Sequence, residues 1–293
     1  MRVTQGMLSN NMLRNLMNSN DKMGKYMDQL NTGKKITRPS DDPVVAMKGM
    51  GYRTELVKVE QFQRNTNEVH NWMDNTDAAL DKATSALQRI RELAVQASNG
   101  TYSEEERVNM SEEVKQLKEH LVEIANTNVN DKYIFNGSQT DTAPVDAEGN
   151  VIFDPSEVKI EVSSSTTLKA NVNGEDVFGG DPDIFEVIDK FTAKLDGDEA
   201  IDEDIDASIE ELDTGINNII NSRAELGARM NRLELVENRL GEQEVIATQT
   251  MSQNEDIDYA EAITQLITQE SLHRAALSAG SKIIQPSLVD FLR

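Results

Sequence analysis

Residues 205–251 read IDASIEELDTGINNIINSRAELGARMNRLELVENRLGEQEVIATQTM, and the helical architecture expected for the chain follows from this segment. Positions taken in alternating steps of four and three residues are mostly apolar, which is a sustained heptad pattern. They are Ile205, Ile209, Leu212, Ile216, Ile219, Arg223, Leu226, Met230, Leu233, Glu237, Leu240, Glu244, Ala247 and Met251. The stretch contains no proline, so it predicts one helix about 70 Å long at a rise of about 1.5 Å per residue.

A helix of this length with one apolar stripe needs partner helices along its whole length, because it cannot bury the stripe against itself. The N-terminal part of the chain offers such partners. Residues 9–30 carry a weaker, methionine-rich stripe: Met12, Leu16, Ser19, Met23, Tyr26 and Leu30. This segment is rich in asparagine, which lowers helix propensity, so we expect it to order only when packed. Gly33 fits its C-terminal cap.

Asp42-Pro43 predicts the start of a second helix, with Asp42 as N-cap and Pro43 at the first helical position. Its stripe consists of Val45, Gly49, Tyr52, Leu56 and Val59, and then of Trp72, Thr76, Ala79, Ala83, Ala86, Ile90, Leu93 and Ala97. A turn at residues 99–102 and a capping box from Ser103 to Glu106 predict a third, antiparallel helix. That helix carries Met110, Val114, Leu117, Leu121 and Ile124, and its signal ends near Asn130.

In the centre of the chain, apolar residues recur at every second position, which is typical of β-strands. Val158, Ile160 and Val162 alternate, as do Leu168, Ala170 and Val172, and Asn173-Gly174 is a turn signal. Tyr133 to Gly137 predicts a short strand and turn. Asp181-Pro182 predicts a short helix that carries Ile184, Ile188, Phe191 and Leu195 on one face. After a polar break at residues 252–256, a last helix carries Tyr259, Ile263, Leu266, Leu277, Gly280 and Ile284, and Pro286 ends it.

The fold class that follows is mainly α with a small β insert. We expect an elongated antiparallel helical bundle or coiled coil, formed by the N- and C-terminal segments, with a central, mostly β outer domain. The expected domains are inner terminal helices at residues 1–40 and 255–293 whose ordering is coupled to assembly, a long-helix bundle at residues 41–135 and 200–254, and an acidic, mostly β outer domain at residues 136–199. The nested order of the patterns brings the two ends of the chain together.

The composition and net charge disfavour several classes of function. The formal net charge is −23, which disfavours nucleic acid as a partner because phosphate binding needs a basic face. Residues 141–213 alone carry 22 Asp and Glu against four Lys, so we expect this part on a solvated outer surface. No cysteine is present. No apolar run reaches the roughly 18 residues of a membrane span, and the first residues lack the apolar core of a cleaved signal peptide.

The sequence predicts no catalytic residue, no cofactor and no metal site, and we expect no enzyme. The three histidines (His70, His120 and His273) are far apart in the sequence. Asp202 to Asp206 resembles the start of a calcium loop, but Ala207 stands where the loop needs glycine and Asp213 where it needs glutamate. Acidic residues that favour a helix N-terminus explain this segment better.

Three segments resemble the flagellin family. Residues 30–46 read LNTGKKITRPSDDPVVA and residues 88–101 read QRIRELAVQASNGT. The third segment runs from Ala275 to Ile284 and continues as Ser287 to Leu292. Within the family, Ser40 to Pro43 and the turn at Tyr133 to Gly137 are similar to members that join hook and filament. The final Leu292-Arg293 is similar to filament flagellins.

The resemblance implies an axial structural protein of the bacterial flagellum, exported without a cleaved signal peptide and located outside the cell at the hook–filament junction. It implies four partners, which are the first hook–filament junction protein, flagellin, copies of the same chain and a flagellar export chaperone. The alternatives are a filament flagellin and, more distantly, a cytoplasmic helical adaptor. The side chains expected at the assembly interface are Leu8, Met12, Leu16, Met23, Leu30, Ile263, Leu266, Leu277, Ile284, Leu288 and Leu292.

Overall fold

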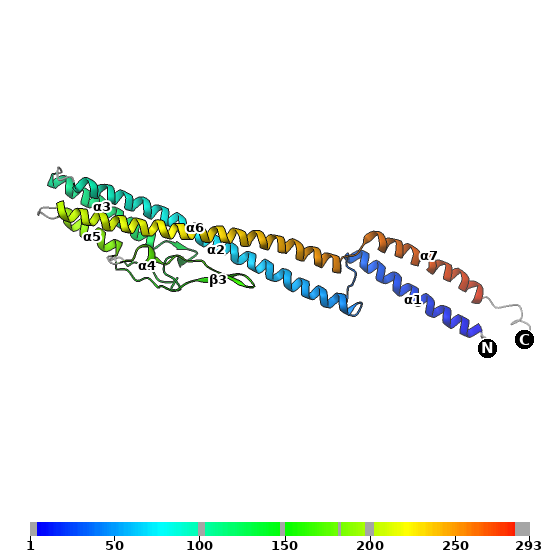
Figure 1. The fold of residues 1–293 in the computed structure, drawn as a ribbon. Helices are drawn as coiled ribbons and strands as arrows, with labels where there is room; N and C mark the ends of the chain where they lie inside the picture. The colour runs from blue at the N-terminus through cyan, green and yellow to red at the C-terminus, as the bar shows by residue number, and fades with distance from the viewer. Residues whose placement is uncertain (1–4, 99–102, 147–149, 181–182, 197–201, 285–293) are drawn as a thin grey trace, which may run out of the picture. The chain divides into compact units, whose positions relative to one another are not determined.

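The computed structural model describes residues 5–98, 103–146, 150–180, 183–196 and 202–284 (Figure 1). Its helices and strands are, in chain order, α1 (Gln5–Thr32), α2 (Pro43–Ser98), α3 (Glu104–Ala125), β1 (Asn128–Val129), β2 (Lys132–Tyr133), β3 (Lys159–Ser163), β4 (Thr166–Lys169), α4 (Gly174–Val177), α5 (Ile184–Leu195), α6 (Asp202–Glu255) and α7 (Tyr259–Ile284). The mainly helical class with a small β insert is confirmed.

The chain forms two compact units. The first unit comprises residues 1–58 and 243–293, and the second unit comprises residues 59–242. The boundary falls within α2 and within α6, so each of these helices contributes residues to both units. The three-part division expected from the sequence stays a prediction.

The core of the second unit is built on the heptad stripe of α6. Ile205, Leu212, Ile219, Leu226, Leu233 and Leu240 are fully buried, which confirms the predicted stripe. Facing residues of α2 are also buried, including Trp72, Ala79, Ala83, Ala86, Ile90 and Leu93. Because small alanine side chains allow helix axes to approach closely, α2 serves as the partner that the stripe of α6 requires.

Ion pairs show that α2 and α6 run antiparallel in this unit. Arg91 pairs with Asp213, and Arg223 pairs with Asp77 at 3.0 Å and with Asp81 at 2.8 Å. Residue numbers fall along α2 as they rise along α6. These partners are partly exposed, so they fix the register more than they add stability.

The β insert consists of two small antiparallel hairpins. Strands β1 and β2 are joined by Asn130 and Asp131, whose φ angles of 54° and 61° are those of a tight two-residue hairpin turn. Strands β3 and β4 pair Ile160 with Leu168. The hairpin of β3 and β4 is tied to α2, because the Asn65 side chain donates to the Glu161 carbonyl at 2.7 Å.

Aromatic and aliphatic side chains fill the insert. The rings of Phe135 and Phe178 meet edge to face at 5.4 Å between centroids, and Phe178 and Phe185 lie 6.0 Å apart. The predicted face of α5 is buried, with Ile184, Ile188, Phe191 and Leu195 between 0% and 4% exposed. These side chains belong to the same hydrophobic core as the buried residues of α2 and α6 in the second unit.

Several predicted boundaries are wrong, for local reasons. Asn173-Gly174 does not form a hairpin turn, because the Asn173 side chain accepts a hydrogen bond from Glu175 N at 3.1 Å and caps α4. Helix α3 ends at Ala125 rather than near Asn130, since the Asn126 side chain bonds to the Val145 carbonyl and the next residues pair as β1. Asp183 caps α5. The predicted features at residues 99–102, 181–182 and 286 lie outside the described residues.

Substitution of Leu233 by alanine is expected to lower the free energy of unfolding of the second unit by about 2–5 kcal/mol, because it leaves a cavity in the α2–α6 core. Leu235→Ala is the matched control in the same helix, since Leu235 is 71% exposed, and it should change stability by less than about 0.5 kcal/mol. Urea unfolding followed by the fluorescence of the single tryptophan, Trp72, reports on this unit. Equal losses in the two variants would contradict the packing described.

Candidate assembly interface

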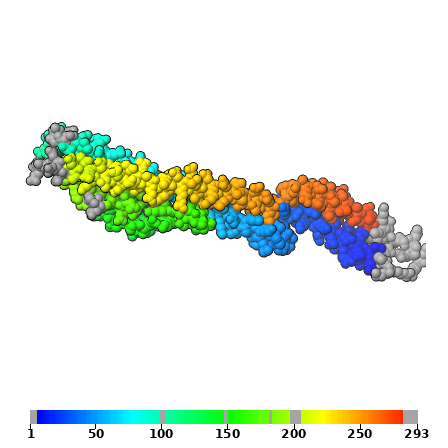
Figure 2. All heavy atoms as spheres, viewed as in Figure 1, coloured from blue at the N-terminus to red at the C-terminus, as the bar shows by residue number. Residues whose placement is uncertain are grey.

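Helices α1 and α7 of the first unit pack side by side as an antiparallel pair, and Figure 2 shows them in contact in blue and orange to red. Three contacts fix their register. Met12 lies against Gly280, where a β-carbon would collide with the Met12 side chain. Gln269 donates to Ser19 Oγ at 2.8 Å. The Tyr259 hydroxyl lies 2.8 Å from the point where Gly33 would carry a β-carbon.

The stripe predicted for α1 lies in the seam between the two helices. Met12, Leu16, Met23, Tyr26 and Leu30 are half-buried and Ser19 is buried. The stripe predicted for α7 is partly wrong. The seam side of α7 consists of Ala262, Leu266, Gln269, His273, Ala276 and Gly280. Three of these six residues, Ala262, Ala276 and Gly280, are small, and at Gly280 the helices approach closely.

The two long sides of the α1–α7 pair differ in polarity. On one side a groove of about 280 Å³ opens between the helices, and its lining combines polar side chains such as Gln29, Glu261 and Gln265 with the apolar Ile257 and Ala262. Leu8 and Leu272 are exposed on the groove side, whereas helical periodicity places six other exposed apolar residues of the two helices on the opposite side. They are Leu13 (48% exposed), Met17 (64%), Met27 (55%), Ile263 (46%), Ile267 (57%) and Leu277 (49%), and we call this set the apolar face.

The backbone joins the α1–α7 pair to α2 and α6 at two short connections. Gly33 has a φ of 69°, which favours glycine, and its N–H donates to the Gln29 carbonyl at 2.8 Å, so it caps α1 as predicted. Lys35 N donates to the Glu255 carbonyl at 2.7 Å, and Ile257 N donates to the Gly33 carbonyl at 3.0 Å. These backbone hydrogen bonds join the two connections in the manner of neighbouring antiparallel strands.

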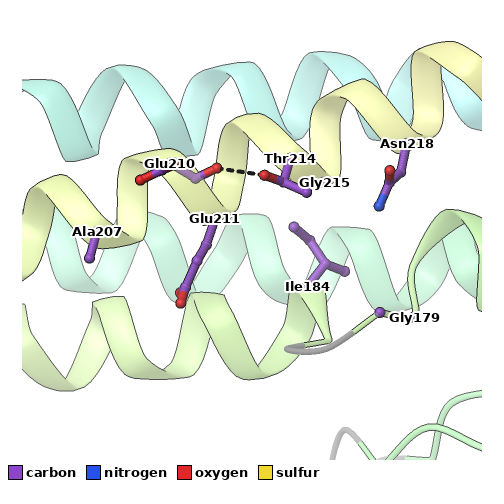
Figure 3. Close-up of a pocket in the computed structure, with 9 residues that line it drawn as sticks. Gly179, Ile184, Ala207, Glu210, Glu211, Thr214, Gly215 and Asn218 are labelled. Carbon is purple, nitrogen blue, oxygen red and sulfur yellow. Dashed lines mark hydrogen bonds between the residues drawn. The ribbon is translucent and has the colours of Figure 1, made fainter.

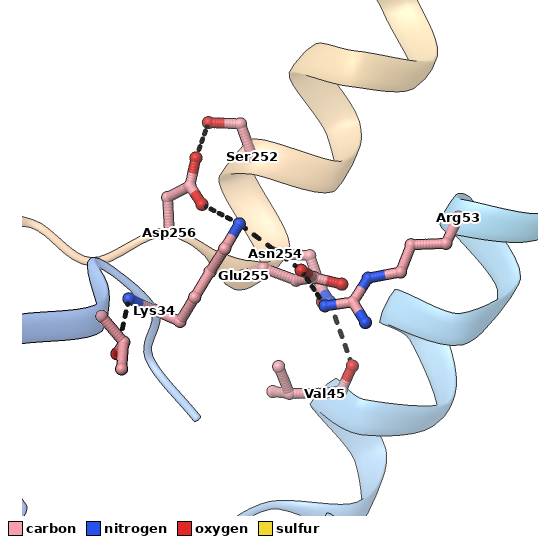
Figure 4. A network of polar contacts seen from close by, with 8 residues as sticks. Lys34, Val45, Arg53, Ser252, Asn254, Glu255 and Asp256 are labelled. Atoms are coloured by element: carbon pink, nitrogen blue, oxygen red, sulfur yellow. Dashed lines mark hydrogen bonds and ion pairs between the residues drawn. The ribbon is translucent and has the colours of Figure 1, made fainter. Parts of the chain in front are cut away.

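Glu255 is the centre of a polar network at this point (Figure 4). Its side chain is only 5% exposed and pairs with Arg53 at 2.6 Å and Lys34 at 3.6 Å. It approaches α2 closely because Gly49 has no side chain, and a β-carbon there would overlap the carboxylate. A buried carboxylate is tolerated only when it is paired in this way.

Neighbouring groups extend the network. Lys34 also pairs with Asp256 at 2.6 Å, and Ser252 donates to the same carboxylate. The hydrogen bond to Asp256 raises the pKa of Lys34, and the hydrogen bond from Lys34 lowers the pKa of Asp256. Asn254 donates to the Val45 carbonyl at 3.0 Å. Because these polar residues bond across the unit, α6 continues to Glu255 instead of ending at the predicted Met251.

The start of α2 matches the predicted capping. The Asp42 carboxylate accepts hydrogen bonds from Val44 N at 3.0 Å and Val45 N at 3.1 Å, and Pro43 is the first helical residue. Asp41 accepts from the backbone N–H of Arg38 and Thr37, and the first of these bonds contributes most to the lowered pKa of Asp41. Sequence reasoning placed this capping but missed the role of Glu255.

The predicted interface residues fall into three groups. Met12, Leu16, Met23, Leu30 and Leu266 lie in the seam within one chain. Leu8, Ile263 and Leu277 are exposed, and the last two belong to the apolar face. Ile284 is in α7, without a described side chain, and Leu288 and Leu292 lie outside the described residues. Their role in assembly stays a prediction.

Other sites offer little chemistry. A hollow of about 340 Å³ in the second unit is lined by residues that include Gly179, Ile184 and Asn218 (Figure 3). The Thr214 hydroxyl in its lining donates to the Glu210 backbone carbonyl at 2.9 Å and not to a carboxylate. The histidines lie on α2, α3 and α7.

Among the described residues, no group of three or more His, Asp or Glu side chains could hold a metal ion. Residues 202–213 are helical, which is not the backbone of a calcium loop. Within the described ranges, no helix combines the length and apolarity that spanning a bilayer requires.

Known proteins resemble the chain along most of its length. The family description "Bacterial flagellin N-terminal helical region" matches residues 3–140, and "Bacterial flagellin C-terminal helical region" matches residues 209–292. Flagellar hook-associated protein 3 of Escherichia coli strain K12 is 29% identical over 300 residues, which cover 94% of this chain and 94% of that protein. A flagellin of Bacillus subtilis strain 168 is 27% identical over 292 residues, with the same coverage of both chains.

A solved structure supports the fold. The structure of a flagellar hook-associated protein from Vibrio parahaemolyticus superposes with a TM-score of 0.70 at 21% identity. The superposition covers 74% of this chain and 100% of that chain.

Gly49→Ala is expected to destabilise the first unit by about 1–3 kcal/mol, because the added methyl displaces the buried Glu255 carboxylate from its partners. Gly51→Ala is the matched control in α2, since its β-carbon meets open space, and it should stabilise the helix by up to about 1 kcal/mol. Hydrogen exchange of residues 43–58 measures both effects. Similar hydrogen-exchange protection of these amides in the two variants would contradict the proposed role of Gly49.

The Lys34–Asp256 pair also predicts a pH dependence. A lowered carboxylate pKa stabilises the fold above the ordinary Asp value of 3.8, and this contribution is lost as the pH falls through the lowered pKa. Asp256→Asn should therefore reduce the protection of the Lys35 and Ile257 amides at about pH 5, and the difference from wild type should narrow towards about pH 3. A difference that widens on acidification would contradict the assigned sign.

Proposed function

The chain belongs to the flagellin family and is a structural protein of the bacterial flagellum, and from this premise we propose that it is the adaptor between hook and filament. The observation that carries the proposal is the similarity to flagellar hook-associated protein 3, which extends over 94% of both chains. The Asp-Asp-Pro sequence at residues 41–43, which caps α2, is part of the segment that first suggested this role.

The apolar face supplies the physical basis of assembly. Six apolar side chains of α1 and α7 are 46–64% exposed on one side of the pair. Removing apolar surface from water contributes about 25 cal/mol per Å², and contiguous exposed apolar patches mark interaction sites. Covering this face with a neighbouring subunit therefore favours association.

We assign the layers of the assembled protein as the sequence suggests. Residues 1–40 and 255–293 form the inner layer, residues 41–135 and 200–254 the next, and residues 136–199 the outer surface. The acidic charge of residues 141–213 supports an outer, solvated position for the insert. The proposed partners are the first junction protein, flagellin, copies of the chain and an export chaperone, reached after export without a cleaved signal peptide.

A filament flagellin is the second candidate. The observation that favours it is the 27% identity to the Bacillus subtilis flagellin over 94% of both chains. The two functions require different amounts of protein in each flagellum. A filament protein forms the long polymer, whereas a junction adaptor occupies one short zone. The cytoplasmic helical adaptor receives no support from the flagellar relatives.

Deletion of the gene distinguishes these functions. A strain without the chain should keep its hooks, release flagellin into the medium and lose attached filaments, as seen by electron microscopy and by analysis of the medium. A strain that loses flagellin itself would identify the chain as the filament protein. Normal filaments in the deletion strain would refute the junction role.

The apolar face is tested by restoring the deleted gene with point variants. Ile267→Asp should fail to restore attached filaments, because a carboxylate in a covered apolar surface is costly. Gln265→Asp is the matched control, since Gln265 lines the groove on the other side of the same helix. Secretion of both variants into the medium must be equal. Restoration by both variants would exclude the apolar face as a contact.

A further inference from the structure

The buried residues of the first unit are small or polar. Among the residues of this unit that the structure describes, they are Ser19, Gly49, Glu255, Ala262 and Gly280. The contiguous hydrophobic core of the chain lies instead between residues 59 and 240, within the second unit. Because close-packed apolar side chains are the usual means of fixing how helices sit against one another, other contacts have to fix them in the first unit.

Packing is loose where α1 and α7 join α2 and α6. A hollow of about 130 Å³ borders the connection that follows α1 and the start of α2, and its lining includes Ile36, Pro39 and Ala46. The groove of about 280 Å³ reaches the same connection at Lys35 and the connection before α7 at Ile257. Side chains do not fill this region, so directed polar bonds have to hold it.

The last turn of α6 supplies such bonds to two other segments. The Gln253 carbonyl accepts a hydrogen bond from the Lys35 ammonium group at 2.7 Å, and the Asn254 side chain donates to the Val45 carbonyl of α2. Glu255 follows directly and makes contacts to both segments. Three consecutive residues thus hold the connection after α1 and the start of α2 to the end of α6.

Glu255 is the residue at which these contacts meet (Figure 4). Its carboxylate accepts from Arg53 of α2 at 2.6 Å and pairs with Lys34 at 3.6 Å, and its carbonyl accepts from Lys35 N at 2.7 Å. The carboxylate is only 5% exposed and fits beside α2 because Gly49 has no side chain. A buried carboxylate that loses a partner has to move towards water, so removing a cation opens this arrangement.

We propose that Glu255 is a positioning residue, which fixes the direction in which the α1–α7 pair leaves α2 and α6, and that assembly depends on this direction. The second part rests on the proposed function, because a chain that joins other subunits has to present its terminal helices in a set direction. A chain in which the pair points in several directions is competent only part of the time. Its apparent affinity for a neighbouring subunit falls by the competent fraction.

The first test measures the direction in the purified full chain, by pulsed electron spin resonance between two spin labels. The chain has no cysteine, so labels go only to exposed positions that are changed to cysteine. Gln249→Cys in α6 with Ser271→Cys in α7 reports the direction, and Asn18→Cys with Ser271→Cys reports the α1–α7 pair itself. Arg53→Met and Glu255→Met should each turn a single narrow 249–271 distance into a broad distribution and leave the 18–271 distance unchanged.

These variants keep the length of the side chain and remove only its polar group, and two controls make the test specific. Arg53→Lys keeps the cation and should keep the narrow distance, whereas Lys48→Met removes an exposed cation from the same helix and should change nothing. Unchanged 249–271 distances in both Arg53→Met and Glu255→Met would overturn the proposal. Loss of the 18–271 distance would also overturn it, because Glu255 would then stabilise the pair rather than direct it.

The second test restores the deleted gene with the same variants. Arg53→Met and Glu255→Met should reduce the fraction of hooks that carry filaments by about tenfold, which corresponds to about one chain in ten in the competent direction. Arg53→Lys and Lys48→Met should restore filaments as the wild-type gene does. Secretion of all variants into the medium must be equal.

Two kinds of failure can be told apart. Failure of the wild-type gene to restore filaments would count against the junction function itself, while the distances in the purified chain would still test the direction. Broad 249–271 distances together with full restoration by Arg53→Met and Glu255→Met would overturn the dependence of assembly on Glu255. An equal loss of filaments with Lys48→Met would overturn it as well, because the loss of any cation would then have the same effect.

Discussion

An apolar helix stripe has to be covered, and the two units meet this constraint differently. In the second unit, α6 buries Leu212, Leu226 and Leu240 completely against residues of the same chain. In the first unit, α1 and α7 cover only one stripe of each other, and Leu13, Met17 and Ile267 stay about half exposed or more. The stripe of α6 in the second unit is covered within the chain, whereas the α1–α7 pair of the first unit still has apolar surface to cover. This difference connects the fold to a protein that works by joining other subunits.

Ion pairs and hydrogen bonds give the first unit a defined geometry. Hydrophobic contact has little directionality, so the apolar face alone would not orient the pair. Glu255 is buried between Arg53 and Lys34, Gly49 leaves the room that its carboxylate needs, and backbone bonds join the connections on either side. A buried ion pair of this kind adds little net stability compared with apolar packing, and it selects one arrangement over others. The apolar face is thereby presented in one orientation.

Much of this was predictable from residue patterns. The heptads of α6, the stripe of α1, the Asp42 cap and the glycine cap at Gly33 follow local rules of period and capping, and the structure confirms them. The side of α7 that faces α1 was partly missed, because α7 is apolar on more than one side and small residues such as Gly280 mark a close contact only when the partner is known. The role of Glu255 was missed because it joins residues about 200 positions apart. Whether the apolar face is an interface depends on a partner that no single chain contains.

The most direct measurement is the accessibility of the apolar face before and after assembly. The chain has no cysteine, so Leu13→Cys introduces a single thiol on this face without background labelling. Coverage of this face in the assembled flagellum predicts rapid reaction with a water-soluble maleimide in the purified chain and strong protection in intact flagella from a strain that makes the variant. Equal labelling in both states would contradict it, because the face would then remain open to solvent in the assembled flagellum.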